Sequence, residues 1–382
     1  MRLPVKAERL RDRILSNPKF QRWAAKFPLT KPVADRRASD LFDLCAGFVY
    51  SQIFYACVRL RILEAVAEET KSAAELAEQS GMGSDAMGRL LDAAVALSLL
   101  ERRGDRYGLG RHGTSYIGNP GIADMVAHHA MFYRDLSDPV ALLRGQAPAT
   151  ELQRFWSYTQ DHEIADTDAV LGYSRLMASS LSMLAEDILE AYPMRAHQHL
   201  LDVGGGLGAF VRAVADHEPD LALTLFDLPA VAASARIELD ASGHLPRIEV
   251  IGGDAIHDPL PGGVDLVSFV RILHDHDDES ALAFLEAARR ALVPGGTVMI
   301  AEPMRAPGAE KVGDAYFGFY LLAMGQGRPR SPEEIGKLLE LAGFERIAEK
   351  KTRRPMLTSL VVAKKPSWSK ALPTIYPSVN LS

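Results

Sequence analysis

Short apolar runs alternate with longer segments that predict helices over the C-terminal half of the chain. Five of these runs have the length and composition of strands: His199–Val203, Ala222–Asp227, Ile248–Ile251, Val264–Val270 and Thr297–Ala301. A helix is predicted between the last two, over Asp278–Ala291. This alternation indicates an α/β fold with a parallel sheet that helices cover on both faces. Ligands of such sheets bind beyond the carboxyl ends of the strands, so the chemistry is expected directly after each run.

A chain of 382 residues is too long for one ordinary core and predicts two domains. We predict a basic N-terminal arm over 1–37, a helical domain over 38–192, the sheet domain over 193–365 and a tail over 366–382. Cys45 and Cys57 lie in an apolar stretch without metal-ligand spacing. We expect both to be core thiols in a reducing cytoplasm, and no metal site is predicted.

The helical region has the element order of a winged helix. Ser72 and Glu75 form a capping box, Gly81–Gly83 a turn, Ser84–Leu100 a second helix, and Glu101–Leu109 two short strands around a Gly-Asp turn. A DNA-binding regulator is therefore an alternative. The second helix, however, holds one Arg and two Asp among mostly apolar residues, whereas a DNA reader needs several cations and polar side chains. We expect this helix to pack on another helix or subunit, in a homodimer without a nucleic-acid partner.

The N-terminal arm is basic although the whole chain is acidic. Residues 1–40 hold eleven Lys and Arg against four Asp and Glu, a net charge of +7, so the remainder carries −13 of the total of −6. Apolar residues spaced roughly for one helical face, interrupted at Pro18, are Leu10, Ile14, Leu15, Phe20, Trp23 and Phe27. This composition fits a helix at a membrane surface, and also an arm that packs on a partner subunit or stays mobile.

The remaining apolar stretches are short or broken by charge, so no transmembrane helix is expected. The basic start of the chain lacks the apolar run of a signal peptide. We predict a cytoplasmic protein, with peripheral membrane contact as an open alternative.

A glycine-rich turn follows the first predicted strand, in the run Asp202-Val-Gly204-Gly205-Gly206-Leu-Gly208. Glycines let a backbone turn sharply and let a ligand approach closely, although a plain strand-to-helix turn has the same composition. A nicotinamide dinucleotide site would show G-x-G-x-x-G, whereas the spacing here is G-x-G-x-G with an acid before it. S-adenosylmethionine carries no phosphate, and its ammonium, sulfonium and ribose diol require acceptors and close backbone. The run therefore favours S-adenosylmethionine over NAD.

Acids also follow the second and third predicted strands. Asp227 lies 23 residues after Gly204, where a carboxylate can accept two hydrogen bonds from a ribose diol. Both types of cofactor use an acid there, so Asp227 alone does not choose between them. Asp254, after the third strand, is placed to reach an adenine amino group.

Successive motifs along the chain resemble those of the plant-type O-methyltransferase family: Asp202–Gly208, Phe226–Pro229, Gly252–Asp254, Arg271–Asp275, Pro294–Gly296 and Ala301–Glu302. The resemblance covers roughly Asp40 to Lys365. It implies a Rossmann-like class I methyltransferase sheet, an N-terminal all-helical, winged-helix-like dimerisation domain, and S-adenosylmethionine as methyl donor. The cofactor-binding residues that it implies are Asp202, Gly204, Gly205, Gly206, Asp227, Leu228, Asp254, Ala255 and Arg271.

The resemblance further implies two catalytic residues. His274 has the position of the family's general base, a role that suits an imidazole because it titrates near neutrality. Glu302 has the position of the carboxylate that hydrogen-bonds and orients this ring. His276 stands where Trp is usual, either to stack on adenine or as part of a polar turn, and Pro329 stands where many plant members have a second Glu. Arg271 pairs either with an acid near the cofactor or in a structural salt bridge.

Three segments are similar to one branch of this family, the enzymes that methylate acyclic hydroxycarotenoids of the hydroxyneurosporene and demethylspheroidene type: Leu41–Gln52, Val270–Asp278 and Gly327–Pro332. This similarity implies methyl transfer to a tertiary hydroxyl. A bacteriochlorophyllide C-methyltransferase and an O-methyltransferase of a phenolic metabolite remain alternatives. Residues that suit a long apolar groove, or ordinary core packing, are Met125, Met131, Phe132, Tyr133, Phe155, Trp156, Tyr158, Tyr316, Phe317, Phe319, Tyr320 and Met324.

Overall fold

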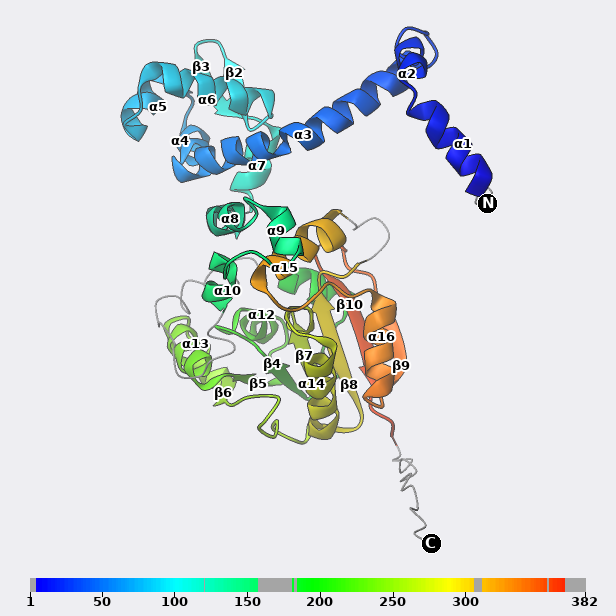
Figure 1. Ribbon diagram of the computed structural model, residues 1–382. Helices are drawn as coiled ribbons and strands as arrows, with labels where there is room; N and C mark the ends of the chain where they lie inside the picture. Colours follow the sequence, from blue (N-terminus) through cyan, green and yellow to red (C-terminus); the bar gives the residue numbers. More distant parts are fainter. Residues whose placement is uncertain are drawn as a thin grey trace. The chain divides into compact units, whose positions relative to one another are not determined.

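The structure is a computed structural model that describes residues 5–119, 121–156, 181, 184–305, 311–355 and 357–367. It divides into two units, Met1–Ala123 and Asp124–Ser382 (Figure 1). The division falls within α8 (Gly121–Asp135), and α9 (Pro139–Leu143) and α10 (Glu151–Trp156) contact α15 (Gly318–Met324) of the second unit. The domain boundary that we predicted, between residues 192 and 193, does not coincide with this division. It falls within the second unit, shortly before the first strand of the sheet. Tyr158 and residues 368–382 of the predicted tail lie outside the described residues.

Seven strands of the described second unit form one sheet in the order β6-β5-β4-β7-β8-β10-β9 (Figure 1). Their bounds are β4 His199–Val203, β5 Ala222–Asp227, β6 Ile248–Gly252, β7 Val264–Val270, β8 Leu292–Glu302, β9 Glu345–Lys350 and β10 Ser359–Lys364. The strands from β6 to β8 are parallel and confirm the five predicted strands. β10 runs antiparallel to both neighbours, so the sheet is mixed rather than parallel. Burial of an apolar strand does not depend on its direction, so composition could not predict this reversal.

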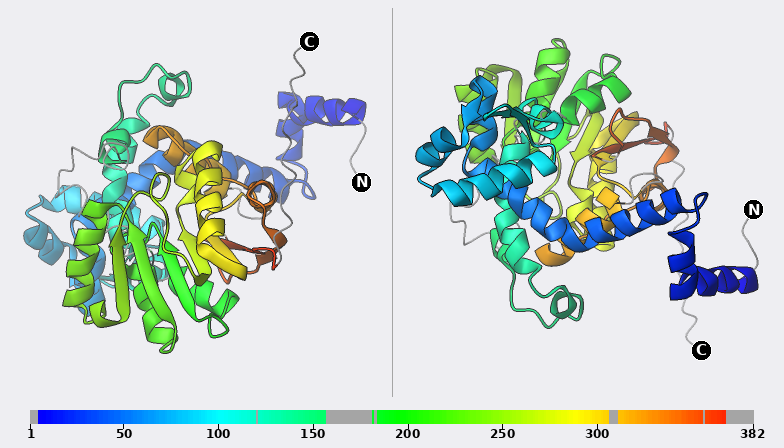
Figure 2. Two further views of the ribbon diagram at one scale, coloured as in Figure 1. Left: turned by 90° about the horizontal axis from the view of Figure 1, so that it is seen from below. Right: turned by 90° about the horizontal axis from the view of Figure 1, so that it is seen from above.

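Helices cover both faces of the sheet, as predicted (Figure 2). On one face α12 (Ala209–His217) and α13 (Pro229–Ala241) pack with residues 184–191 in one buried cluster. On the other face α14 (Asp278–Ala291) and α16 (Pro332–Leu341) pack in a second cluster. Successive strand residues alternate between the faces, and the turns that follow β4, β5, β6, β7 and β8 meet at one edge of the sheet.

The first unit has the predicted winged-helix order. Its elements are α3 (Lys31–Arg59), α4 (Ile62–Glu68), β1 (Lys71–Ser72), α5 (Ala73–Ser80), α6 (Ser84–Ala96), β2 (Leu100–Arg103), β3 (Arg106–Leu109) and α7 (Arg111–Ile117). The capping box of Ser72 and Glu75 is present. α6 contacts α3 and α5, as its apolar composition predicts. It ends before Leu100 because Ser98 takes a left-handed φ of 56° and Leu100 begins β2.

The N-terminal arm forms two helices, α1 (Val5–Leu15) and α2 (Pro18–Ala24). They are separated at Asn17, whose side chain accepts the backbone N–H of Lys19 at 2.8 Å and so caps α2. Apolar side chains of the arm are exposed at Leu10, Ile14, Trp23, Phe27 and Leu29. Cationic and apolar groups are thus both accessible on this arm.

α3 exposes apolar side chains, among them Leu41, Phe42, Leu44 and Phe48. Cys45 is also exposed, so the expectation of a core thiol is wrong for Cys45; it is correct for Cys57, where burial raises the pKa of the thiol to about 12. By length and composition α3 could cross a membrane, and only 11% of its most apolar window is buried. This contradicts the expectation that every apolar stretch is too short or too charged. An apolar surface of this kind indicates contact with another surface.

Candidate active site

The glycine-rich turn after β4 brings backbone close to neighbouring side chains. A Cβ at Gly204, where φ is 73°, would lie 2.3 Å from the Ile272 side chain, and a Cβ at Gly205 would lie 2.8 Å from the Asp202 carboxylate. At Gly206, where φ is 57°, a Cβ would meet no atom within 4 Å. The turn is therefore closed toward the protein and open at Gly206, as a backbone cradle for a ligand requires.

Asp227, at the end of β5, joins this turn to the next strand. Its Oδ2 accepts the backbone N–H of Gly206 at 2.7 Å, and its Oδ1 accepts that of Leu228 at 2.7 Å. Burial raises the pKa of Asp227 to about 6, and the two N–H donors oppose that rise. The structure therefore brings together Gly206, Asp227 and Leu228, three of the residues predicted to bind the cofactor.

Asp202 lies buried under the same turn. Its Oδ1 accepts the Ser268 hydroxyl at 2.6 Å, whereas Oδ2 has no hydrogen-bond partner among the residues that the structure describes. Burial raises the pKa of Asp202 to about 7, opposed by the Ser268 bond and reinforced by the charge of Asp227. A buried acceptor without a partner beside an open glycine fits a ligand that carries positive charge or hydrogen-bond donors, as S-adenosylmethionine does.

Asp254 follows β6 and organises its own loop. Its Oδ1 accepts the backbone N–H of Ile256 at 2.9 Å, and its Oδ2 lies 2.8 Å from Nδ1 of the exposed His257. The neighbouring Ala255 is buried. Contact of Asp254 and Ala255 with adenine stays a prediction.

His274 lies in the short 3-10 turn η3 (Leu273–Asp275) that follows β7, and it is 3% exposed. Its Nε2 lies 3.1 Å from Oδ1 of Asp275, and Nδ1 has no hydrogen-bond partner within the described ranges. Burial lowers the pKa of His274 well below its usual value, and the charges of Arg271, Arg330 and His276 act in the same direction. The imidazole is therefore neutral at neutral pH.

Glu302 ends β8 beneath the same turn. Its Oε2 accepts the backbone N–H of His274 at 3.1 Å, while the imidazole ring lies against Asp275. The structure thus differs from the predicted contact between Glu302 and the ring. The reason is that a buried N–H at the start of a turn requires an acceptor, and Glu302 supplies it. Burial raises the pKa of Glu302 to about 7, opposed by the charge of Arg330.

Arg271 and His276 flank the turn. Arg271 has a left-handed φ of 59°, and its backbone N–H donates to the backbone carbonyl of Ala301 at 2.8 Å. The charge of Arg271 opposes the rise that burial causes in the pKa of Asp275. The His276 ring meets the ring of Phe284 edge-on at 4.9 Å between centroids, and burial lowers its pKa to about 4. A contact of either residue with the cofactor stays a prediction.

Aromatic side chains from two segments meet beside His274. The Phe317 ring centroid lies 5.8 Å from that of His274 and 5.1 Å from that of Tyr316. Phe132 of α8 continues the cluster, 6.0 Å from Tyr316 and 5.4 Å from Tyr320. The structure thus joins several residues predicted for an apolar groove into one aromatic wall, defined here as Phe132, Tyr316, Phe317 and Tyr320. Met125 is exposed and lies outside this wall.

Two imidazole–phenol pairs lie in this wall and were missed from the sequence. His128 Nε2 lies 2.8 Å from the Tyr320 hydroxyl, and His129 Nε2 lies 2.7 Å from the Tyr316 hydroxyl. Burial lowers the pKa of His128 to about 4 and raises that of Tyr316 to about 12, so these groups are neutral at neutral pH. Asp275 was also missed as the partner of the ring, although it directly follows His274.

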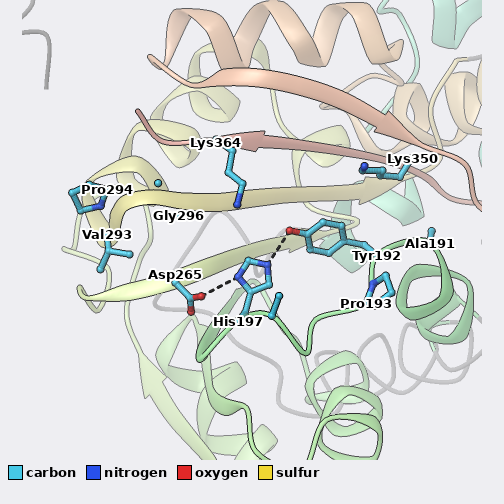
Figure 3. A pocket seen from close by; sticks show the side chains of 12 residues that line it. Ala191, Tyr192, Pro193, His197, Asp265, Val293, Pro294, Gly296, Lys350 and Lys364 are labelled. Atoms are coloured by element: carbon cyan, nitrogen blue, oxygen red, sulfur yellow. Dashed lines mark hydrogen bonds and ion pairs between the residues drawn. The ribbon is translucent and has the colours of Figure 1, made fainter. Parts of the chain in front are cut away.

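A groove of about 590 Å³ lies at the opposite edge of the sheet (Figure 3). Asp265 is the second residue of β7, and a ring nitrogen of His197 lies 3.0 Å from its carboxylate. The other ring nitrogen of His197 lies 2.9 Å from the Tyr192 hydroxyl (Figure 3). Lys350 and Lys364 also line it. None of the predicted site residues lines this groove, because they follow the strands and the groove precedes them.

Profiles of two known domains match the sequence: the O-methyltransferase dimerisation domain over residues 42–119 and the O-methyltransferase domain over residues 133–345. The chain is 42% identical to demethylspheroidene O-methyltransferase of Cereibacter sphaeroides, over 94% of this chain and 95% of that protein. The chain belongs to the O-methyltransferase family. This methyltransferase is also 40% identical to demethylspheroidene O-methyltransferase of Rhodobacter capsulatus, over 92% of this chain and 88% of that protein. It is 31% identical to mouse acetylserotonin O-methyltransferase, over 84% of this chain and 87% of that protein.

The fold of the methyltransferase is similar to that of human N-acetylserotonin methyltransferase, solved in complex with S-adenosylmethionine. The TM-score is 0.73 at 24% identity, over 86% of this chain and 98% of that chain. The predicted fold class is therefore confirmed. The O-methyltransferase domain that matches residues 133–345 uses S-adenosylmethionine as methyl donor, which confirms the cofactor chosen from the glycine spacing and overturns the NAD-dependent alternative.

We expect Asp227→Asn to weaken binding of S-adenosylhomocysteine at least tenfold at pH 8, because charge-assisted hydrogen bonds contribute about 1.5–3 kcal/mol each. The carboxylate is the form that accepts hydrogen bonds from a ribose. Since its pKa is about 6, the parent protein loses this advantage as the pH falls through 6. The ratio of the two dissociation constants should therefore approach one near pH 5, as measured by calorimetry.

Asp265→Asn is a matched control, because Asp265 also accepts backbone N–H groups, from His199 at 2.8 Å and Gln198 at 3.0 Å, but at the other edge of the sheet. Its affinity for S-adenosylhomocysteine should stay within threefold of the parent protein. Equal losses in the two variants would contradict a specific role for Asp227.

Proposed function

We propose that this methyltransferase transfers a methyl group from S-adenosylmethionine to the tertiary hydroxyl of an acyclic hydroxycarotenoid, which gives a methoxycarotenoid. The observation that carries the proposal is identity of 42% and 40% to two demethylspheroidene O-methyltransferases over at least 92% of this chain. A relative named for a phenolic acceptor, 3-amino-4-hydroxybenzoate 4-O-methyltransferase of Streptomyces cremeus, is 29% identical. This difference favours a carotenoid over a phenol, and the names of these relatives favour methylation of oxygen over that of a bacteriochlorophyllide carbon.

The donor would be held at the ends of β4, β5 and β6. S-adenosylmethionine supplies an electrophilic methyl group on a sulfonium. Gly204, Gly205 and Gly206 would admit it to the backbone, Asp227 would accept from its ribose, and Asp202 and Asp254 would accept from its remaining donors. The Oδ2 atom of Asp202, which has no hydrogen-bond partner within the described ranges, supports this arrangement.

The aromatic wall supports an apolar acceptor. Phe132 and Tyr320 are buried, and the wall reaches the imidazole of His274 through Phe317. Rings of this kind offer a polyene apolar contact along its length. The neutral imidazole–phenol pairs place hydroxyl groups within the same wall, where they can meet the polar end of the acceptor.

His274 would take the acceptor's proton. We assign the ring N–H to Nε2, because Oδ1 of Asp275 lies 3.1 Å from that nitrogen and Nδ1 has no acceptor among the described residues. Burial raises the pKa of Asp275 well above its usual value, and both forms of the carboxyl group keep an oxygen that can accept this N–H. Nδ1 then carries the lone pair, and it is the nitrogen without a partner in the described part of the chain. The lowered pKa keeps this lone pair free near neutral pH.

A tertiary alcohol is far less acidic than a phenol, so it cannot be fully deprotonated before attack. Each unit of pKa mismatch costs about 1.4 kcal/mol. The proton must therefore leave as the new carbon–oxygen bond forms, or after it. Alignment of the hydroxyl oxygen supplies much of the rate in such a reaction.

We further propose a homodimer formed through the first unit. The exposed residues Phe42, Leu44 and Phe48 of α3 fall within the match to the dimerisation domain. A second copy over this face would cover Cys45 as well. Light scattering at micromolar concentration should give twice the chain mass of 41.7 kDa, and a clean monomer would contradict the proposal.

The N-terminal arm would contact an anionic membrane surface. It precedes the dimerisation match, residues 1–40 carry a net charge of +7, and the Trp23 and Phe27 rings of the arm stack at 5.1 Å on its exposed surface. Clustered cations attract anionic lipids, and an exposed indole suits the bilayer interface. Such contact would bring the enzyme to a membrane where a carotenoid acceptor dissolves.

The proposed function predicts methylation of a hydroxycarotenoid in detergent. Purified protein with labelled S-adenosylmethionine should label a tertiary hydroxycarotenoid in preference to phenols and chlorophyllides. His274→Ala should lower the single-turnover rate about 10²–10⁴-fold, with affinity for S-adenosylhomocysteine nearly unchanged. Preferential labelling of a phenol or a chlorophyllide would overturn the acceptor assignment. A variant rate within threefold of the parent would show that His274 is not the base.

The arm predicts charge-dependent binding to vesicles. The protein should float with phosphatidylcholine vesicles that contain phosphatidylglycerol, and less with phosphatidylcholine alone. Arg22→Gln with Lys26→Gln should weaken this binding about 30-fold, because each cation near an anionic surface contributes about 1 kcal/mol. Arg102→Gln with Arg103→Gln removes the same charge from the exposed hairpin and serves as the control. Equal flotation with both lipids, or equal losses in both variants, would contradict the proposal.

A further inference from the structure

The segment Gly327–Ser331 crosses the turn that carries His274. Arg330 of this segment is fully buried, and its guanidinium points at the turn. Nη1 donates to the carbonyl of Leu273 at 2.5 Å, and Nη2 donates to the carbonyl of His276 at 2.8 Å. Nε donates to Oδ1 of Asp278 at 2.8 Å. One side chain thus holds both ends of the turn and the first residue of α14.

The backbone of the same segment completes the contact. The N–H of Arg328 donates to the carbonyl of His274 at 2.9 Å. At Gly327, where φ is 77°, a Cβ would lie 2.2 Å from that carbonyl oxygen, so only glycine permits this approach. Glu302 accepts the N–H of His274 at 3.1 Å. Both backbone groups of His274, its N–H and its carbonyl, are therefore fixed by hydrogen bonds.

We propose that Arg330 is a positioning residue, which fixes the imidazole of His274 by binding the carbonyls on either side of it. The proposal rests on the proposed role of His274. Arginine suits this task because its planar fork presents several donors in fixed directions, whereas lysine presents one ammonium group. The segment thereby fixes the turn through the side chain of Arg330 and the backbone N–H of Arg328.

Arg330 also supplies charge to the site. The groups that affect the ionisation of His274 are Arg271, Arg330 and His276, with Asp275 and Glu302 beside them. A guanidinium near the imidazole disfavours the imidazolium. Its removal should raise the pKa of His274, so the protonated and inactive form persists to higher pH. The acid limb of the pH–rate profile should then move upward.

Two variants separate geometry from charge. Arg330→Met removes both the donors and the charge, so it should lower the single-turnover rate at least tenfold and move the acid limb upward. Arg330→Lys keeps the charge but loses the fork, so the rate should fall while the acid limb stays near that of the parent. Affinity for S-adenosylhomocysteine should stay within threefold in both, because Asp227 and the glycine turn are untouched.

Arg354→Met is the matched control for lost stability. Arg354 pairs with the fully buried Asp187 at 2.8 Å, away from the turn, so its removal destabilises the same unit without touching the carbonyls around His274. Thermal unfolding should show a lower melting temperature for both arginine-to-methionine variants than for the parent protein. The rate loss and the shift of the acid limb should occur for Arg330→Met alone.

Hydrogen exchange tests the positioning role without any acceptor. Peptides that cover residues 271–278 should exchange faster in Arg330→Met than in the parent or in Arg354→Met. Unchanged exchange there, or a rate loss no greater than that of Arg354→Met, would overturn the proposal. Failure of the parent protein to methylate hydroxycarotenoids would overturn the proposed function instead, and the exchange result would stand independently of it.

Discussion

Exclusion of water at the carboxyl edge of the sheet determines the charge of the ionisable groups in the site. Asp202, Glu302 and His274 are each at most 3% exposed. Burial raises the pKa of the two acids to about 7 and lowers that of the imidazole. Several carboxyl groups can therefore lie close together without a large net charge. A cationic sulfonium beside them would favour their ionised forms, so donor binding and the charge of the edge are coupled.

The parallel part of the sheet was predictable because each strand is a short apolar run that ends in glycines, acids or a histidine. β7 and α14 have the bounds predicted for them. The direction of β10 was not predictable, since an apolar strand buries the same side chains in either direction. The exposure of Cys45 was missed for a related reason: an apolar pattern indicates that a face is covered, but not whether the same chain covers it.

The sequence predicted which of these residues lie close together. It was less successful in predicting which atoms of them form hydrogen bonds. The glycine turn and Asp227 come together because both follow parallel strands. Glu302 reaches the turn as expected, but it accepts the backbone N–H of His274 rather than the ring. Sequence spacing places a carboxylate within reach of a turn, whereas the rotamer of the ring depends on local packing. Arg330 was read only as part of a motif, because burial of an arginine is rare.

For the proposed acceptor, a tertiary alcohol of weak acidity, alignment is more important than the strength of the base. The turn that carries His274 is held through its backbone N–H and carbonyl groups. Arg271 enters it with a left-handed φ, a conformation that costs about 1–3 kcal/mol and persists only where the surroundings fix it. Glu302 and Arg330 supply those surroundings through their hydrogen bonds to the backbone of the turn. An imidazole with a lowered pKa stays unprotonated over a wide pH range, so in the proposed role of His274 as base its lone pair would be free whenever an acceptor arrives. The buried contacts of the turn would then determine whether that lone pair points at the hydroxyl.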